Sequence, residues 1–155
     1  MIRYVIVAAI ALFAMVGLAM AQPDTGPPRW MANMSRLHQV VMNGIPRPYA
    51  NARDPMPDTP AKLRRGAAVF DRHCAACHGA SGQGTGPDAF ALVPAPADLE
   101  WLARTPESRS EPYMYWSIAE GGQSFGSEMP AFKQTLSPKD RWSVIAFIRA
   151  GFPRQ

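Results

Sequence analysis

The distribution of proline restricts the fold of this chain more than any other feature. All 16 prolines lie after residue 21, and with the glycines of that region they make up roughly a fifth of it. Because proline cannot donate a hydrogen bond to a sheet and glycine weakens strands, this density argues against a large β-sheet. No segment alternates apolar and polar residues over a useful length, whereas several repeat apolar residues at helical spacing. We therefore expect an all-α fold with long loops rich in glycine and proline.

The first 21 residues form a targeting segment. Arg3 supplies a positive charge, residues 4–21 carry none, and Ala19-Met20-Ala21 has the small-x-small form that signal peptidase cleaves. We expect a signal peptide over 1–21; the alternative is an uncleaved membrane anchor, because this apolar run just reaches across a bilayer. Both interpretations place the rest of the chain in the periplasm, either soluble or anchored on the periplasmic face of the membrane.

Two further regions follow. Residues 22–58 read as a proline-rich extension with one amphipathic helix, Trp30–Asn43, which Gly44 would end; residues 45–59 should be extended and irregular. Residues 59–155 read as one helical domain. Its expected helices begin at Thr59-Pro60 and run towards Cys74, then cover 98–104 and 111–120, and finally run from the capping box at Ser137 to Gly151.

The sequence Cys74-Ala75-Ala76-Cys77-His78 carries the chemistry of the chain. This C-x-x-C-H pattern is the attachment signature of c-type haem: two thiols add to the two vinyl groups, and the histidine binds the iron. Two alternatives are a redox-active cysteine pair and half of a zinc site. A redox-active pair of this kind would lie in a βαβ unit, which the sequence does not predict, and a zinc site would need further cysteines, which the chain lacks. The pattern predicts one covalent haem c with iron as its metal.

A second iron ligand is expected on the opposite face of the haem. Met129 is the strongest candidate, because it lies 51 residues after His78 in a loop and precedes Pro130, which keeps its backbone extended. Its thioether is a soft, neutral donor that raises the reduction potential. His73 adjoins the attachment site and cannot swing across, and Met114 falls in a helix where packing explains it better. The remaining candidates lie upstream: Met31, Met34, His38, Met42 and Met56.

From residue 59 to 152 the order of these features resembles the class I cytochrome c family. Cys74–Gly79 and Gly121-Gly122…Met129-Pro130-Ala131-Phe132 are similar to bacterial monohaem cytochromes and to the cytochrome domains of haem–copper oxidases. The resemblance implies that the first and last helices of the domain cross. Gly66 and Phe70 would then meet Trp142, Ile145 or Ala146.

The family also implies a proline whose carbonyl supports the ligand imidazole. Gly84-Thr85-Gly86-Pro87 is similar to that loop, so Pro87 is our candidate, with Pro94 second. Several side chains are candidates for hydrogen bonds to the haem propionates, with core packing or a solvated surface as the alternative: Trp101, Trp116, Tyr113, Tyr115, Arg104 and Arg109.

The expected function is one-electron transfer with His78 and Met129 as axial ligands, by a periplasmic carrier or a cytochrome subunit of a respiratory complex. Such a protein is not itself an enzyme. The resemblance implies redox partners: a quinol-oxidising complex upstream, and a terminal oxidase or reductase downstream. One alternative is a haem enzyme or gas sensor with a labile distal ligand. Another is copper handling through Met31, Met34, His38 and Met42, which share one side of a helix.

The net charge of +4 comes from the extension and the first helix of the domain. Residues 22–73 hold 8 basic and 4 acidic side chains, whereas residues 74–155 hold 7 basic and 8 acidic ones. This distribution predicts no nucleic acid partner. It favours an extension that docks on a protein partner or associates with an anionic membrane surface.

Overall fold

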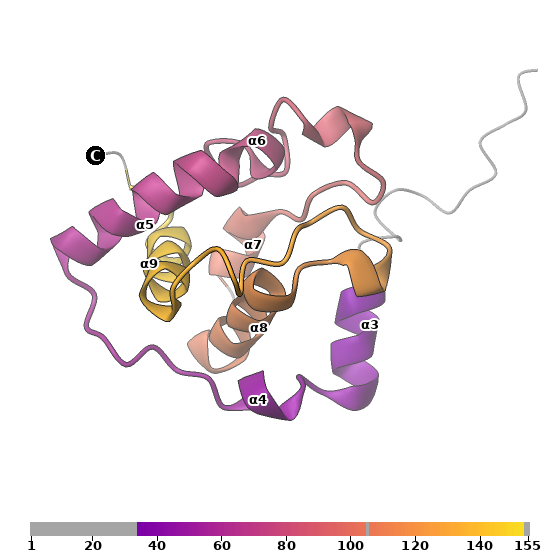
Figure 1. Ribbon diagram of the computed structural model, residues 1–155, viewed down its shortest axis with the longest axis horizontal. Coiled ribbons are helices and arrows are strands. Elements are labelled where there is room, and N and C mark those ends of the chain that lie inside the picture. The colour runs from indigo at the N-terminus through magenta and orange to yellow at the C-terminus, as the bar shows by residue number, and fades with distance from the viewer. Residues whose placement is uncertain (1–33, 105, 154–155) are drawn as a thin grey trace, which may run out of the picture.

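The computed structural model describes residues 34–104 and 106–153 (Figure 1). These residues form helices and loops without a strand, which confirms the predicted all-α fold. The predicted signal or anchor segment, 1–21, lies outside the described residues. The helices are α3 (Met34–Asn43), α4 (Arg47–Ala50), α5 (Pro60–His73), α6 (Ala75–His78), α7 (Leu99–Ala103), α8 (Glu107–Glu120) and α9 (Pro138–Arg149), with short 3-10 turns η1 (Ala89–Ala91) and η2 (Gln123–Phe125).

Helices α5 and α9 begin where local capping chemistry starts them. The Thr59 hydroxyl accepts a hydrogen bond from the Lys62 amide at 3.2 Å, and the Ser137 hydroxyl accepts one from the Asp140 amide at 3.1 Å. Proline occupies the first position of each helix, where a missing N–H costs nothing. Both starts agree with the sequence-based expectation.

Helices α5 and α9 cross, as the family resemblance implies, and Figure 1 shows α9 lying beneath α5. Gly66 lies at the crossing: a Cβ atom there would overlap the carbonyl oxygen of Ser143 and lie 2.8 Å from the Cβ of Phe147. Phe70 also meets Phe147, with ring centroids 5.7 Å apart. The α9 atoms nearest to Gly66 thus belong to Ser143 and Phe147, which the expectation did not name, while the expected partners Trp142 and Ile145 share the buried core cluster with Phe70.

The hydrophobic core lies among α5, α8, α9 and the loop between the last two. Residues 141–148 of α9 are all buried, so this helix is enclosed on every side over two turns. The other core residues come from all of these segments: Val69, Phe70, Met114, Ile118, Phe132 and Leu136. The sites discussed below are built on this cluster.

The extension packs on the domain instead of standing apart from it. Helix α3 ends at Asn43, and Gly44 follows with φ +74°, as predicted. Residues 45–59 contain the helical turn α4, so the prediction of a wholly irregular segment was wrong there; Pro48 fits the first turn of that helix. Figure 1 places α3 beside the segment that follows α8, and α4 below α8.

The link between α4 and α5 is held by a buried lysine. The Lys62 ammonium lies 2.6 Å from carboxylate oxygens of both Asp54 and Asp58 and donates to the Met56 carbonyl at 2.9 Å. Burial lowers the pKa of Lys62, but the two carboxylates outweigh it, and the net pKa lies above its ordinary value. A charge this buried is stabilised only because it is paired.

Helix α7 agrees with the expected helix at 98–104, and Asp98 caps it by accepting from the Trp101 amide at 3.0 Å. Helix α8 begins at Glu107, four residues earlier than expected, and contains Pro112 in its second turn. Gly121 ends it with φ +67°. Within 34–104 and 106–153, no helix is both long enough and apolar enough to cross a bilayer.

Candidate functional site

The two cysteines stand on one tight turn at the end of α5. Cys74 ends α5, with its amide bonded to the Phe70 carbonyl at 2.8 Å, and the single turn α6 follows it directly. Cys77 and His78 both donate their amides to the Cys74 carbonyl, at 3.2 and 2.8 Å. This turn fixes the spacing of two thiols and an imidazole in the order that the attachment pattern requires.

The thiols are not set up as a redox pair. Both are free and half-buried. Burial raises the pKa of Cys74 to about 12, and the neighbouring Cys77 makes a smaller contribution. Burial also raises the pKa of Cys77, with a smaller contribution from Asp88. A redox-active C-x-x-C pair instead stabilises its thiolate. The structure therefore favours the haem interpretation of the pattern over the redox one.

His78 is held by its Nδ1 atom. The Nδ1–H group donates to the Ala97 carbonyl oxygen at 3.0 Å, and Nε2 has no hydrogen-bond partner among the described residues. Burial lowers the pKa of His78, although the bond to Ala97 acts in the opposite direction. The imidazole is thereby kept neutral with its lone pair on Nε2, which is the form that binds a metal.

The carbonyl that supports His78 was not predicted correctly. The sequence suggested Pro87, or else Pro94, but the acceptor belongs to Ala97. Pro87 lies instead in a strap against α6: the amides of Gly86 and Asp88 on either side of it donate to the Cys77 and Ala76 carbonyls at 3.1 and 2.9 Å. Gly86 is required in this strap, because a Cβ atom there would overlap the Ala76 carbonyl oxygen.

Ala97 reaches the imidazole because the loop folds back on itself. Gly84 donates its amide to the His78 carbonyl at 2.8 Å, and a Cβ atom at Gly84 would lie 2.5 Å from the Pro96 carbonyl oxygen. The Leu99 amide then donates to the Gly82 carbonyl at 2.7 Å. These contacts bring the start of α7 against the turn that follows His78.

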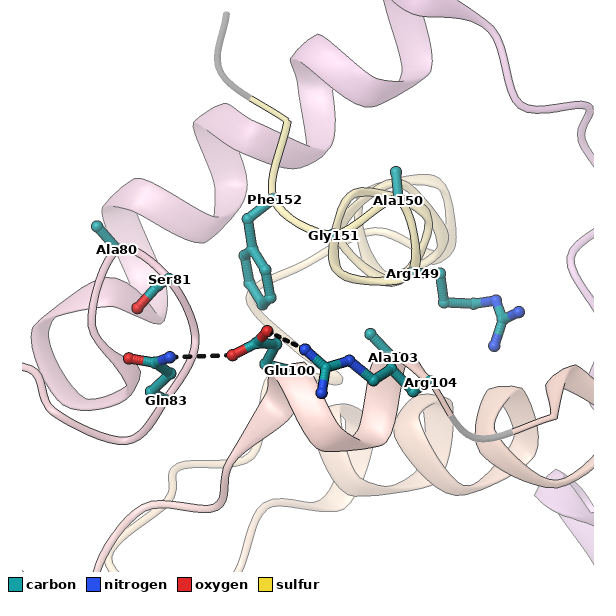
Figure 2. Close-up of a pocket in the computed structure, with 10 residues that line it drawn as sticks. All are labelled: Ala80, Ser81, Gln83, Glu100, Ala103, Arg104, Arg149, Ala150, Gly151 and Phe152. Atoms are coloured by element: carbon teal, nitrogen blue, oxygen red, sulfur yellow. Dashed lines mark hydrogen bonds and ion pairs between the residues drawn. The ribbon is translucent and has the colours of Figure 1, made fainter.

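Side chains lock the same junction from outside. A groove of about 660 Å³ lies at this junction. Glu100 accepts a hydrogen bond from Gln83 at 2.9 Å there and pairs with Arg104, and Figure 2 shows both interactions. Phe152, after α9, forms another wall of this groove. The groove contains none of the predicted ligands. Its visible role is to fasten the loop after α6 to α7, and so to hold Ala97 in place.

Met129 lies in the loop between α8 and α9, here called the methionine loop (residues 121–137). The Gly122 amide donates to the Met129 carbonyl at 2.8 Å, and the Met129 amide donates to the Ser127 hydroxyl at 3.2 Å. Gly121 must be glycine, because a Cβ atom there would lie 2.8 Å from the Met129 carbonyl oxygen. The Met129 carbonyl is therefore bound to the end of α8, and its amide is bound to Ser127 within the same loop.

The cysteine turn and the methionine loop meet on one core. Cys74 and Met129 both pack, half-buried, against the core cluster. His73 and Phe132, which are near neighbours of these two residues in the chain, make an edge-to-face contact with centroids 5.9 Å apart. His73 is exposed and makes only this ring contact among the described residues, whereas Met114 of α8 is 2 % exposed and packs in the core.

The donor set fits a covalent haem. Two free thiols stand three residues apart. In the adjacent His78, Nδ1 is hydrogen-bonded to the Ala97 carbonyl oxygen, so Nε2 is the nitrogen that can bind a metal. Met129 comes from a loop that packs on the same core. Cys74 and Cys77 would hold the porphyrin, and His78 and Met129 would ligate the iron. The ligand assignment remains a prediction.

The candidates for propionate contacts divide into packed and exposed residues. Tyr115 stacks on Trp142 with centroids 4.3 Å apart and accepts from Arg141 at 3.0 Å, and Trp116 is buried against Phe125. Packing explains both. Trp101 is exposed, Tyr113 lies edge-on to Trp116, and Arg104 pairs with Glu100; the side chain of Arg109 lies outside the description.

The copper alternative depends on residues that are only partly described. Met31 and the side chain of Met34 lie outside the description, and His38 and Met42 are both exposed on α3. The residue of this helix that turns inward is Arg36, which the sequence analysis did not single out. In the sequence, only the position of Arg36 could have indicated its burial: it lies two residues before His38 and on a different side of the helix from the methionines.

Comparison with known proteins identifies similar sequences. A family model described as cytochrome c oxidase, cbb3-type, subunit III, matches residues 61–148. The chain is similar to the cbb3-type cytochrome c oxidase subunit FixP of Sinorhizobium medicae (strain WSM419), at 31% identity over 127 residues. The aligned region covers 76% of this chain and 38% of FixP, so the chain spans about two fifths of the length of that curated relative.

Proposed function

This chain belongs to the cbb3-type cytochrome c oxidase subunit III family, and we propose that it works as the part of a respiratory oxidase that carries single electrons through one haem c. Family membership confirms the class I c-type cytochrome domain and the covalent haem cofactor. The ligand set and the partners are proposals. When bound, the haem iron supplies one-electron chemistry by alternating between its ferric and ferrous states.

Each predicted site residue has a distinct task in this proposal. Cys74 and Cys77 would hold the porphyrin covalently, so the cofactor would not dissociate between electron transfers. His78 and Met129 would both ligate the iron, which would leave no site for a substrate on it. The Ala97 carbonyl fixes the ring orientation of His78 and makes its Nε2 a better donor.

The observation that carries the proposal is the hydrogen bond from His78 Nδ1 to the Ala97 carbonyl oxygen. It selects the tautomer in which Nε2 is the donor atom, directly after two thiols that burial keeps in the neutral form. A structural histidine would not need its second nitrogen left without a partner. This arrangement suits a fixed proximal ligand in an electron carrier.

The proposed partner on the electron-accepting side is a cbb3-type oxidase, by analogy with the name of the relative FixP. A quinol-oxidising complex is the proposed donor. We place the haem domain on the periplasmic side of the membrane, with residues 1–21 as signal peptide or anchor. Support for this placement comes from the uncharged run at 4–21 that follows Arg3.

The function is tested by following reoxidation of the ferrous full chain in air. Membranes that contain a cbb3-type oxidase should oxidise it rapidly, and membranes from the same strain without that oxidase should oxidise it at least about tenfold more slowly. Cyanide, which blocks the oxidase, should abolish the difference. Equal rates with both membranes would contradict the proposed partner, while leaving the haem assignment to separate tests.

A further inference from the structure

The N-terminal extension makes a buried polar contact with the methionine loop. Arg36 of α3 is only 8 % exposed, and its Nη2 atom donates a hydrogen bond to the carbonyl oxygen of Gly121, the residue that ends α8. Its guanidinium carbon lies 5.0 Å from the ring centroid of Trp116 and 4.7 Å from that of Phe125. A buried guanidinium needs such partners, because leaving water is costly for a charge.

The atoms that Arg36 touches adjoin those that hold Met129. Gly121 accepts from Arg36 through its carbonyl, and the next residue, Gly122, donates its amide to the Met129 carbonyl at 2.8 Å. The peptide unit between these two glycines is therefore bonded on one side to the extension and on the other to Met129. Any movement of this unit away from Arg36 also moves the anchor of Met129.

Two more contacts support the same loop from the extension. The Ser35 hydroxyl donates to the Phe125 carbonyl at 3.1 Å, so α3 holds the η2 turn as well as the end of α8. From α4, the Tyr49 hydroxyl donates to the Glu120 carboxylate, which also accepts from Lys133 of the methionine loop at 3.1 Å. The extension thus supports the methionine loop on both sides of Met129 along the chain.

We propose that the extension is a brace for the methionine loop, and that Arg36 is the positioning residue through which it holds Met129 on the iron. The inference rests on the proposed function, because it assumes that Met129 is the distal ligand. Met129 must leave the iron before another ligand can bind there, and release requires the loop to move. The contacts of Arg36 with Gly121, Trp116 and Phe125 oppose that movement, so they strengthen ligation by Met129.

The test measures how strongly free imidazole displaces the distal ligand from the ferric full-length holoprotein. Arg36→Met removes the hydrogen-bond donors but keeps an apolar stem, and we expect imidazole affinity to rise about tenfold. Arg36→Lys keeps the charge without the planar guanidinium and should give an intermediate rise. This second variant also supplies the answer if Arg36→Met yields no folded holoprotein.

Two controls separate positioning from other effects. Arg64→Met makes the same change of charge and side chain at an exposed position on α5, and should leave imidazole affinity at the wild-type value. Gly66→Ala crowds the contact of α5 with Ser143 and Phe147 and destabilises the fold without touching the extension or the methionine loop. It should lower the unfolding midpoint but leave imidazole affinity unchanged.

The outcomes distinguish the brace from the ligand assignment. A rise smaller than about threefold for Arg36→Met over Arg64→Met, or an equal rise for Gly66→Ala, overturns the brace. If that happens while the wild-type spectrum shows methionine ligation that Met129→Leu removes, the brace alone fails. If Met129→Leu leaves the methionine–iron band of the wild type in place, the ligand assignment fails, and the brace fails with it.

Discussion

Met129→Leu should leave the haem attached to the chain but remove the long-wavelength methionine-to-iron band from the ferric spectrum. Leucine conserves most of the side-chain volume, so the core against which Met129 packs should tolerate it. The iron then loses its soft distal donor. We expect the reduction potential to fall on the order of 0.1–0.3 V, within the roughly 0.8 V range that axial ligands span.

The same variant decides between an electron carrier and a haem protein with an open site. The wild-type ferrous spectrum should not change when carbon monoxide is added, whereas the ferrous Met129→Leu spectrum should. Met114→Leu is the matched control, because Met114 is buried in α8 and serves packing. A wild-type protein that binds carbon monoxide readily would favour the gas-sensor alternative, and a Met129→Leu variant that keeps the band would assign the ligand elsewhere.

Gly66→Ala should be among the most destabilising single substitutions in the chain. Its Cβ would overlap the Ser143 carbonyl oxygen and lie 2.8 Å from the Phe147 Cβ, so α5 and α9 would have to separate. Alanine favours a helix over glycine by about 1 kcal/mol, but crowding in a packed crossing costs about 3 kcal/mol or more. The net loss of about 2 kcal/mol should lower the thermal midpoint of the holoprotein by roughly 5–10 °C.

Gly126→Ala is the control for this prediction. Gly126 has φ +71°, and no atom lies within 4 Å of the position that a Cβ would take there, so the substitution adds backbone strain without crowding. It should cost about 1 kcal/mol. Thermal unfolding followed by circular dichroism gives both values. A Gly66→Ala protein as stable as the Gly126→Ala protein would contradict the crossing of α5 and α9.

Features that depend on neighbouring residues were predictable from the sequence. The caps at Thr59 and Ser137 satisfy amides three residues away, and Gly44 and Gly121 end their helices through their own backbone angles. The C-x-x-C-H pattern belongs to the same class, because its chemistry lies within one turn. For these features the side chain and its partner are close in the chain, so the pattern determines the contact.

Features that depend on how distant segments meet were not predictable in the same way. The support of His78 comes from Ala97, which contributes only a backbone carbonyl; no residue type in Pro94-Ala95-Pro96-Ala97 marks that role. The rotation of α9 about its axis decided whether Gly66 would meet Ser143 or a neighbouring residue. Both outcomes follow from packing across the whole core.

Arg36 illustrates the largest gap between pattern and structure. An arginine in a polar, proline-rich extension reads as a solvated charge, and the excess of basic residues in 22–73 suggested a docking arm. In the structure, this one side chain is instead buried against two aromatic rings that lie some 80 to 90 residues further along the chain. Trp116 and Phe125 gave no sign of that pairing in the sequence.

The central claim, a single haem held by Cys74 and Cys77, is tested most directly by mass spectrometry. The full chain is produced in cells with a c-type maturation system, denatured, and weighed intact and after proteolysis. We predict a mass increase of one haem, located on the peptide that contains Cys74–His78, with no thiol left to alkylate. A peptide of unmodified mass, whose two cysteines react with iodoacetamide or form a disulfide, would contradict the account.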